Sequence, residues 1–294
     1  MNTRPVALVL HGGAGVLADR SYAREVAHLQ ELAEEGKALL AQGSHAADIA
    51  VKLVRAMEES ALYVAGRGAS PNTAGRYELD ASIMEGPSRK AGAVAALEGF
   101  ISPITAARVV MDSTPHVLIA GAGAADIARQ HEVEAIADPD SYYRPAAVAD
   151  DREIATGTVG CVVLDAHGVL CAATSTGGTL RKRWGRVGDT PIIGSGTWAD
   201  ARVAVSCTGQ GEYFMRANAA ADVSARMRYL KADVNTAVRG VLDDIGVLGG
   251  DGGIIAVDSR GEVCARYNSQ GMKHAIVHAD GRIEAGVTRE DAAR

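Results

Sequence analysis

Aromatic residues and basic charge are both scarce in this 294-residue sequence. Phe, Trp and Tyr together make up 4% of the chain, which argues against a binding surface of stacked aromatic rings. Lys and Arg number 30 against 36 Asp and Glu, so the formal net charge is −6. Because duplex binding needs a concentrated basic surface, we exclude nucleic acid as a partner. We expect the short basic cluster Arg181-Lys182-Arg183 to be a solvated turn.

Cysteines and long apolar runs are also few. The four cysteines lie in apolar, strand-like runs without C-x-x-C spacing: Cys161, Cys171, Cys207 and Cys264. This pattern predicts buried thiols in a reducing compartment rather than disulfides or zinc ligands. No run approaches the ~20 apolar residues of a membrane helix, and residues 6–10 are too short an apolar run for a signal peptide. We therefore predict a cytoplasmic protein with no membrane partner.

The familiar catalytic motifs are missing as well. His11-Gly12-Gly13 resembles the oxyanion loop of lipases, but no G-x-S-x-G motif accompanies it. The sequence contains no G-x-G-x-x-G, Walker A or H-E-x-x-H motif, which excludes the nucleotide folds and zinc peptidases that these motifs identify. We expect no cofactor for catalysis.

What the sequence does contain predicts an α+β protein. The apolar run at residues 6–10 predicts a buried central strand that ends in a glycine turn. Helices are expected near 21–42, from an N-cap at Ser44 to about 60, and near 104–111, 124–132, 211–230 and 234–245. Hairpins are expected over 159–173 and 253–267, and strands near 77–84, 91–97 and 203–206. Residues 138–157, with two prolines and no apolar periodicity, predict a linker. This pattern favours helices that flank stacked sheets.

The first predicted hairpin gathers hydroxyl groups at its open end. Depending on the register of its turn, Thr158 faces either Ser175 or Thr176. If the chain is cut after Gly157, Thr158 gains an α-amine whose pKa of about 7.7–8.0 suits a general base. Glycine also permits the strained backbone that such a cut requires. Taken alone, the hairpin favours the simpler interpretation that threonines suit strands.

Two further loops favour the interpretation in which the chain is cut after Gly157 and Thr158 becomes a nucleophile. Arg186 and Asp189 lie three residues apart in Gly185-Arg186-Val187-Gly188-Asp189, a spacing that suits the carboxylate and ammonium of an amino acid. The alternative is a local surface ion pair. The segment Ser206-Cys207-Thr208-Gly209-Gln210-Gly211 lies between a strand and a helix, where backbone N–H groups favour an oxyanion. The alternative there is a tight glycine turn.

Together these motifs resemble the plant-type (type III) L-asparaginases and isoaspartyl peptidases of the N-terminal-nucleophile hydrolase superfamily. The resemblance extends over nearly the whole chain, in order. It rests on these segments: residues 11–15 (HGGAG), 78–81 (ELDA), 157–160 (GTVG), 173–178 (ATSTGG), 185–189 (GRVGD), 206–209 (SCTG) and 250–253 (GDGG).

The resemblance implies a four-layer αββα sandwich that cuts itself between Gly157 and Thr158. The products would be an α subunit of residues 1–157, with the linker at about 138–157, and a β subunit of residues 158–294, assembled as a dimer of αβ heterodimers. The implied roles are these: Thr158 the nucleophile, Thr176 its support, Arg186 and Asp189 the substrate grips, Thr208 and Gly209 the oxyanion donors, and the Gly211 carbonyl a further contact to the amine.

The resemblance also implies a structural sodium ion held by main-chain carbonyls. The positions that match are Met57, Glu58, Ser60, Tyr63, Ala65 and Arg67. One departure concerns the site itself, because the family usually has Asn-Ala-Gly where this chain has Val64-Ala65-Gly66. The local hydrogen bonding and the rate of processing are therefore open. Arg67 adds a charge that faces either an acidic substrate group or solvent.

We therefore predict an amidohydrolase of β-aspartyl bonds. Its substrates would be L-asparagine or β-aspartyl dipeptides, and the sequence does not rank the two. Within the superfamily, the alternative is a glycosylasparaginase-like or endopeptidase activity. From a different class, the alternative is an unprocessed small-molecule binder. The reason to consider it is Val64, which stands where the family usually has Asn.

Overall fold

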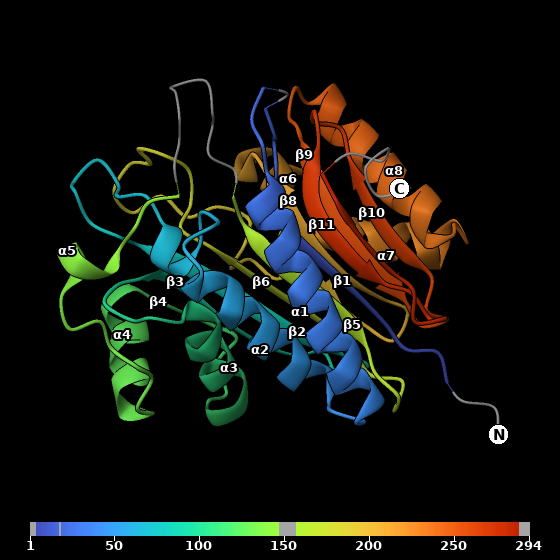
Figure 1. Cartoon of the computed structure of the whole chain (residues 1–294), viewed down its shortest axis with the longest axis horizontal. Helices are drawn as coiled ribbons and strands as arrows, with labels where there is room; N and C mark the ends of the chain where they lie inside the picture. The colour runs from blue at the N-terminus through green and yellow to red at the C-terminus, as the bar shows by residue number, and fades with distance from the viewer. Residues whose placement is uncertain (1–3, 18, 147–156, 288–294) are drawn as a thin grey trace.

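A computed structural model describes residues 4–17, 19–146 and 157–287 of the chain. Residues 147–156, half of the predicted linker at 138–157, lie outside these residues, and the short helix α5 (Pro139–Tyr142) belongs to the half that is described. Two sheets stack face to face, and helices cover the outer face of each (Figure 1). The predicted αββα sandwich is confirmed.

The larger sheet has eight strands in the order β12-β11-β1-β5-β6-β2-β3-β4. Neighbouring strands are antiparallel except β3 and β4, which are parallel. The strands are β1 (Ala7–Ala14), β2 (Leu79–Gly86), β3 (Lys90–Leu97), β4 (Leu118–Ala120), β5 (Val159–Leu164), β6 (Leu170–Thr176), β11 (Met272–Val277) and β12 (Ile283–Gly286). The smaller sheet is antiparallel in the order β10-β9-β8-β7, from β7 (Thr197–Ala199), β8 (Val203–Gly209), β9 (Gly252–Asp258) and β10 (Val263–Tyr267).

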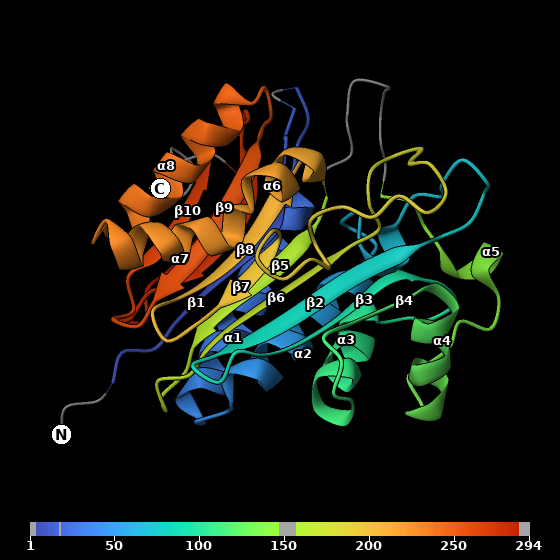
Figure 2. The ribbon, with the colours of Figure 1, turned by 180° about the vertical axis from the view of Figure 1, so that it is seen from behind.

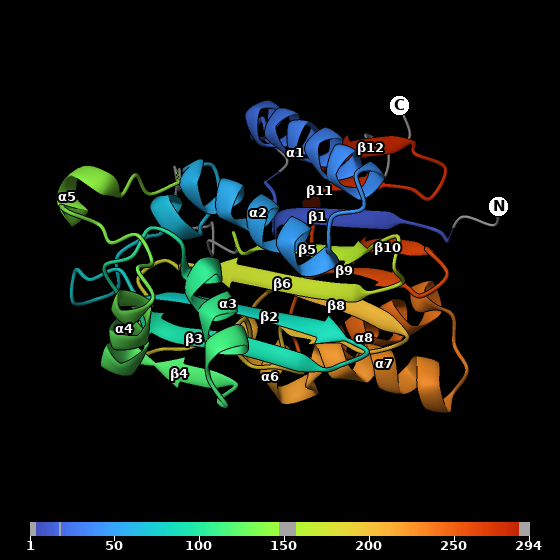
Figure 3. The ribbon, with the colours of Figure 1, turned by 90° about the horizontal axis from the view of Figure 1, so that it is seen from below.

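Four helices pack on the larger sheet and two on the smaller one. The first group is α1 (Ala23–Ala41), α2 (Ala46–Glu59), α3 (Pro103–Ser113) and α4 (Gly121–Gln130), and the second is α7 (Ala219–Tyr229) and α8 (Val234–Val247). Figure 2 shows α7 and α8 in front, on the side opposite to α1 and α2, and Figure 3 shows the layers from a third side. Among the described helices, none combines the length and apolar character needed to cross a membrane.

Strand β1 shows why its apolar run forms a central strand. Leu8 and Leu10 belong to the core beneath the helices, whereas Ala7 and Val9 belong to the core between the sheets. Because successive side chains of a strand point to opposite faces, a strand buried on both sides needs a continuous apolar sequence. The predicted buried strand is confirmed.

Two expected helix boundaries were wrong. The N-cap of α2 is His45, whose Nδ1 accepts from the backbone N–H of Ala47, and not Ser44. The single helix expected at 211–230 is two helices, because Asn218 takes a left-handed conformation (φ 49°) between α6 (Gly211–Ala217) and α7. Helix α6 follows β8 directly, and its N-terminus lies beside the candidate site.

Candidate active site

The predicted nucleophile lies at the open end of the β5–β6 hairpin. Val159 pairs with Ser175 in the ladder, so Thr158 stands opposite Thr176, the second of the two predicted registers. The Thr158 hydroxyl donates to Thr176 Oγ1 at 3.0 Å, and the backbone N–H of Gly178 donates to the same oxygen at 3.0 Å. Both threonines are buried. Because the Thr158 hydroxyl is the donor in its hydrogen bond to Thr176, the lone pairs of Thr158 Oγ1 stay available for attack.

Val64 packs against the residue before the nucleophile. A Cβ atom built on Gly157 would stand 2.6 Å from Val64 Cγ2, so no side chain fits at position 157. The Val64 side chain shares a small apolar cluster with Ala146 and Leu180. Its carbonyl accepts from Gly177 N–H at 2.8 Å. The departure identified in the sequence therefore lies at the predicted cleavage site, as an apolar wall.

The predicted substrate grips come together on two neighbouring loops. A Cβ atom on Gly211 would lie 2.8 Å from Asp189 Oδ1 and 3.1 Å from Arg186 Nη2. Arg186 donates from Nε and Nη2 to both carboxylate oxygens of Glu212, at 3.0 Å each. The sequence reasoning missed Glu212. Its signal is its position directly after Gly211, in the first turn of α6.

Asp189 is a buried carboxylate with an unsatisfied oxygen. Its side chain is 5% exposed, and among the described residues Oδ2 has no hydrogen-bond partner. Burial raises the pKa of Asp189 to about 7, although the Asp189 backbone N–H and the charge of Arg186 act in the opposite direction. A buried acceptor that lacks a donor is costly, and an ammonium ligand would satisfy it.

The predicted oxyanion segment is the turn from β8 into α6. Gly209 ends β8 and pairs with Gly252, and a Cβ atom at Gly209 would stand 2.5 Å from the Asp251 carbonyl oxygen. Thr208 Oγ1 accepts from the backbone N–H of Ala14 at 3.3 Å, so the end of β1 contacts this segment. The structure thus confirms a glycine turn that leads into a helix. The role of Thr208 and Gly209 as oxyanion donors stays a prediction.

The expectation of a solvated turn at residues 181–183 was wrong for Lys182. This side chain is 4% exposed, and its Nζ donates to the Glu78 carbonyl at 2.6 Å. Burial lowers the pKa of Lys182, while the charges of Asp80 and Glu78 oppose that change. The Glu78 carboxylate in turn accepts from the backbone N–H of Gly185 at 3.1 Å. Buried charges therefore hold the loop that carries Arg186, and local sequence patterns gave no sign of them.

Of the six predicted sodium ligands, Met57 and Glu58 lie in the last turn of α2, and Ser60, Tyr63, Ala65 and Arg67 lie in the tightly folded segment that follows it. A Cβ atom on Gly68 would stand 2.0 Å from the Tyr63 carbonyl oxygen, so the backbone closes on itself there. Hard cations prefer such oxygen ligands, and among the described residues no group of three or more His, Cys, Asp or Glu side chains is placed to hold a metal. The donor chemistry of the turn fits a sodium ion. Arg67 is half-buried, and its Nε donates to the Tyr142 carbonyl at 3.1 Å, so part of its side chain binds within the protein.

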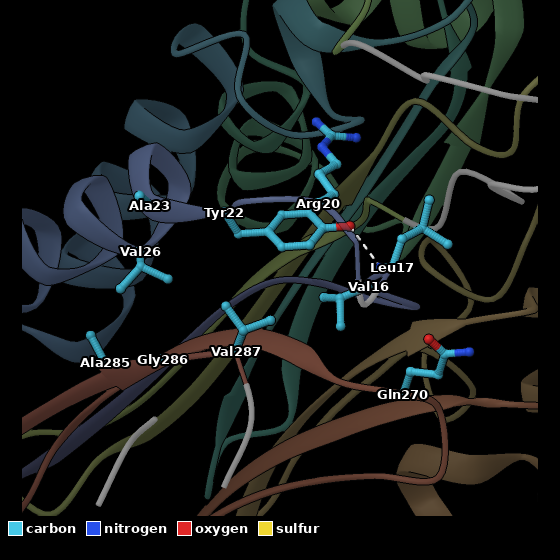
Figure 4. A pocket seen from close by; sticks show the side chains of 10 residues that line it. All are labelled: Val16, Leu17, Arg20, Tyr22, Ala23, Val26, Gln270, Ala285, Gly286 and Val287. Carbon is cyan, nitrogen blue, oxygen red and sulfur yellow. Dashed lines mark hydrogen bonds between the residues drawn. The ribbon is translucent and has the colours of Figure 1, made fainter. Parts of the chain in front are cut away.

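Two cavities lie apart from the nucleophile. One, of about 420 Å³, lies between α1 and β12 beside the loop that follows β1 (Figure 4). The other, of about 520 Å³, includes Glu78 and Gly185 in its wall. Thr158 lines neither of them.

In the smaller of these cavities, the backbone N–H of Leu17 donates to the Tyr22 hydroxyl oxygen at 2.9 Å. The lining is otherwise mainly apolar and includes Val16, Val26 and Val287. None of the residues predicted for catalysis or substrate binding lines this cavity.

Comparisons with known proteins point to one family over nearly the whole chain. The family profile described as asparaginase matches residues 4–149 and 138–287. The chain is 40% identical to an isoaspartyl peptidase of Salmonella typhimurium, with 96% of this chain and 98% of that protein covered. It is 39% identical to an isoaspartyl peptidase of Escherichia coli, with 96% of each chain covered. It is 36% identical to a probable isoaspartyl peptidase/L-asparaginase of Arabidopsis thaliana, with 96% and 98% covered.

Proposed function

Because the chain belongs to the asparaginase family, we propose that it is an amidohydrolase that cleaves β-aspartyl bonds, in L-asparagine or in β-aspartyl dipeptides. The family match and the relatives at 36–40% identity over nearly the whole chain support this reaction class. The observation that carries the assignment of the nucleophile is the 3.0 Å hydrogen bond from Thr158 to Thr176, directly after Gly157.

The chemistry begins with a cut in the chain itself. Thr158 Oγ1 attacks the carbonyl carbon of Gly157, the peptide C–N bond breaks, and water hydrolyses the resulting ester. The products are residues 1–157 and residues 158–294, and Thr158 gains a free α-amine. That amine, with a pKa of about 7.7–8.0, takes the hydroxyl proton in later turnovers.

Substrate binding uses the two grips beside Gly211. Arg186 pairs with the α-carboxylate, and the unsatisfied Asp189 Oδ2 accepts from the α-ammonium, to which the Gly211 carbonyl makes a further contact. Thr158 Oγ1 then attacks the side-chain carbonyl. Ammonia or an amino acid leaves with the proton that the amine held, and water releases aspartate from the ester.

Thr208 and Gly209 would stabilise the oxyanion that forms in each attack. They end β8 immediately before α6, where backbone N–H groups and the start of a helix favour negative charge. In the same proposal, the carbonyls of Met57, Glu58, Ser60, Tyr63, Ala65 and Arg67 hold a sodium ion that fixes the turn next to Val64. The ion supplies structural support and takes no part in bond breaking.

We extend the proposal to assembly and location. The two pieces stay together and pair as a dimer of αβ heterodimers in the cytoplasm. All four cysteines are buried as thiols, which supports a reducing compartment.

A second candidate is an unprocessed small-molecule binder, and one observation favours it. The Val64 side chain presents no hydrogen-bonding group to Gly157, the residue at the proposed cut. An uncut chain would keep the Arg186 and Asp189 grips but would lack the α-amine that serves as base.

Intact-mass measurement after incubation, combined with hydrolysis assays, separates these candidates. The proposal expects two fragments whose masses correspond to residues 1–157 and 158–294, together with release of aspartate. Thr158→Ala should give one uncut chain without hydrolysis. An uncut wild-type chain that binds aspartate but hydrolyses nothing would support the binder instead. If glycosyl-asparagine or a folded protein is cleaved faster than β-aspartyl dipeptides, the activity is instead glycosylasparaginase-like or that of an endopeptidase of the same superfamily.

A further inference from the structure

A chain of buried polar side chains runs between the two sheets and ends at the nucleophile. Counted outward from the nucleophile, its first member is His11 in β1, and successive members alternate between the larger and the smaller sheet. Each member is fully buried, and the members in order are His11, Ser206, Thr174, Thr197 and Ser82. The successive distances are 2.9, 2.8, 2.6 and 2.7 Å. Hydroxyl groups at the centre of a sandwich are costly unless each finds a partner, so this chain is a specific feature of the interior.

The first contact fixes the direction of the next three hydrogen bonds. His11 Nδ1 lies 3.0 Å from the Thr158 carbonyl oxygen, which can only accept, so Nδ1 carries the proton. Burial lowers the pKa of His11 to about 3, so the ring is neutral and Nε2 accepts from Ser206. Ser206 must then accept from Thr174, and Thr174 from Thr197. The hydroxyl protons of Ser206, Thr174 and Thr197 therefore point along the chain toward the backbone of Thr158.

Gly160 provides the space for this arrangement. A Cβ atom built on Gly160 would stand 2.1 Å from Ser206 Oγ and 2.3 Å from His11 Nε2. The hydrogen bond from Ser206 to His11 thus passes over the Cα atom of a residue two positions after the nucleophile. No other amino acid at position 160 would leave this contact in place.

The far end of the chain reaches the substrate-binding loop. Ser82 Oγ lies 2.7 Å from Thr197 Oγ1 and 2.6 Å from the carbonyl oxygen of Thr190. Its single proton serves one of these two acceptors at a time. Thr190 follows Asp189 directly, so the chain begins beside one substrate grip and ends on the nucleophile.

We propose that His11 is a positioning residue for Thr158, and that Ser206, Thr174, Thr197 and Ser82 extend this support to the loop that carries Asp189. The inference rests on the proposed function, since it assigns Thr158 as the nucleophile. Through His11, this chain of hydrogen-bonded side chains holds the Thr158 carbonyl. It thereby also holds the backbone of the residue whose hydroxyl attacks. A displacement of the nucleophile of about 1 Å is enough to lower the rate about a hundredfold.

Two substitutions at Thr174 test the chain at its middle. Thr174→Val keeps the shape of the side chain but removes the hydroxyl, whereas Thr174→Ser keeps the hydroxyl and loses a methyl group. We expect Thr174→Val to lower kcat per processed chain about tenfold or more, with KM within about twofold, because Thr174 touches no substrate grip. Thr174→Ser should retain kcat within about threefold of the wild type. Equal losses in both variants, or an unchanged kcat in Thr174→Val, would overturn the proposal.

A spectroscopic measurement tests the chain independently of activity. Nitrogen-15 NMR of the eight histidines, with His11 assigned from the His11→Asn variant, should show a neutral ring protonated on Nδ1 from pH 5 to pH 9. Thr174→Val should shift the Nε2 resonance, and Thr174→Ser should restore it. A ring protonated on Nε2, or one that titrates in this range, would overturn the inference even in an active enzyme. If the wild type hydrolyses nothing while His11 behaves as expected, the proposed function fails and the positioning of the Thr158 backbone stands.

Discussion

The side chain of Val64 lies against the backbone of Gly157. A Cβ atom at Gly157 would stand 2.6 Å from Val64 Cγ2 and equally far from the Val64 backbone nitrogen. The residue before the nucleophile is therefore enclosed by one apolar side chain and its main chain. This contact sets the surroundings of the bond that we propose is cut.

We expect Val64→Asn to speed cleavage between Gly157 and Thr158. An amide would supply a hydrogen-bond donor beside a carbonyl whose oxygen becomes negative during attack, an effect of about tenfold or more. Burying the amide against Ala146 and Leu180 would cost about 1 kcal/mol or more of stability. The measurement is the fraction of cut chain against time, by intact mass. Val64→Ala is the control for lost packing, and equal rates in wild type and Val64→Asn would contradict the expectation.

Substitution of Thr176 should lower turnover without preventing substrate binding. Thr176→Val removes the acceptor of the Thr158 hydroxyl and leaves the Gly178 N–H without a partner. We expect kcat to fall about a hundredfold, within the usual contribution of a positioned proton acceptor. Thr176→Ser keeps the oxygen and should lose much less. Steady-state kinetics on a β-aspartyl dipeptide would decide, and a normal kcat in Thr176→Val would remove Thr176 from the mechanism.

Glu212 competes with the substrate for Arg186. Its two carboxylate oxygens accept from Nε and Nη2 on one edge of the guanidinium, at 3.0 Å each, where a substrate α-carboxylate is expected to bind. Glu212→Gln keeps the shape and one acceptor but removes the negative charge. We expect KM to fall about two- to fivefold with kcat little changed, since an exposed pair contributes up to about 1 kcal/mol. A raised KM would show instead that Glu212 mainly orients Arg186.

The pH dependence should differ between kcat/KM and kcat. Burial raises the pKa of Asp189 to about 7, so in the free enzyme its carboxylate is increasingly protonated below that pH and cannot pair with an ammonium. We expect kcat/KM to fall about tenfold for each pH unit below 7 from this group alone. In the complex the ammonium lowers the pKa of Asp189, so the acid limb of kcat reports the Thr158 α-amine. Asp189→Asn should lower kcat/KM at every pH and make the acid limb of kcat/KM as shallow as that of kcat. An unchanged acid limb of kcat/KM would exclude Asp189 as the group that titrates there.

Removal of sodium should lower thermal stability. An ion that binds the native turn and not the unfolded chain stabilises by mass action, so we expect Tm to rise by about 2 °C or more when choline chloride is replaced by sodium chloride at equal ionic strength. Potassium chloride controls for a general effect of small cations. Identical Tm values in all three salts would exclude a sodium site in this turn.

The local patterns were sufficient for most of the elements and for the clusters of polar residues at their ends. The apolar run of β1, the hairpin of β5 and β6 and the glycine turn after β8 could be predicted because each depends on neighbours in the sequence. The family resemblance supplied the layers and joined these clusters into one site.

What could not be predicted depends on contacts between distant segments. Lys182 looks like part of a solvated basic turn, but its Nζ reaches the Glu78 carbonyl, 104 residues away. Glu212 is opposite Arg186 only because the β8–α6 turn meets the loop before β7. Asn218 divides the expected helix by taking a left-handed conformation, which helical periodicity does not reveal. Such contacts depend on tertiary packing rather than on propensity.

The strand order of the larger sheet determines when the proposed cut can occur. Strand β1 lies between β11 and β5, and β6 lies between β5 and β2. The pairings β11–β1, β1–β5 and β6–β2 therefore each join a strand before Gly157 to a strand after it. Folding of the intact chain is a first-order process, whereas the cut pieces, once unfolded, would have to find each other in a second-order one. The interleaved sheet therefore requires folding to precede the proposed cleavage. The two pieces would keep strand pairings that formed while they were still one chain.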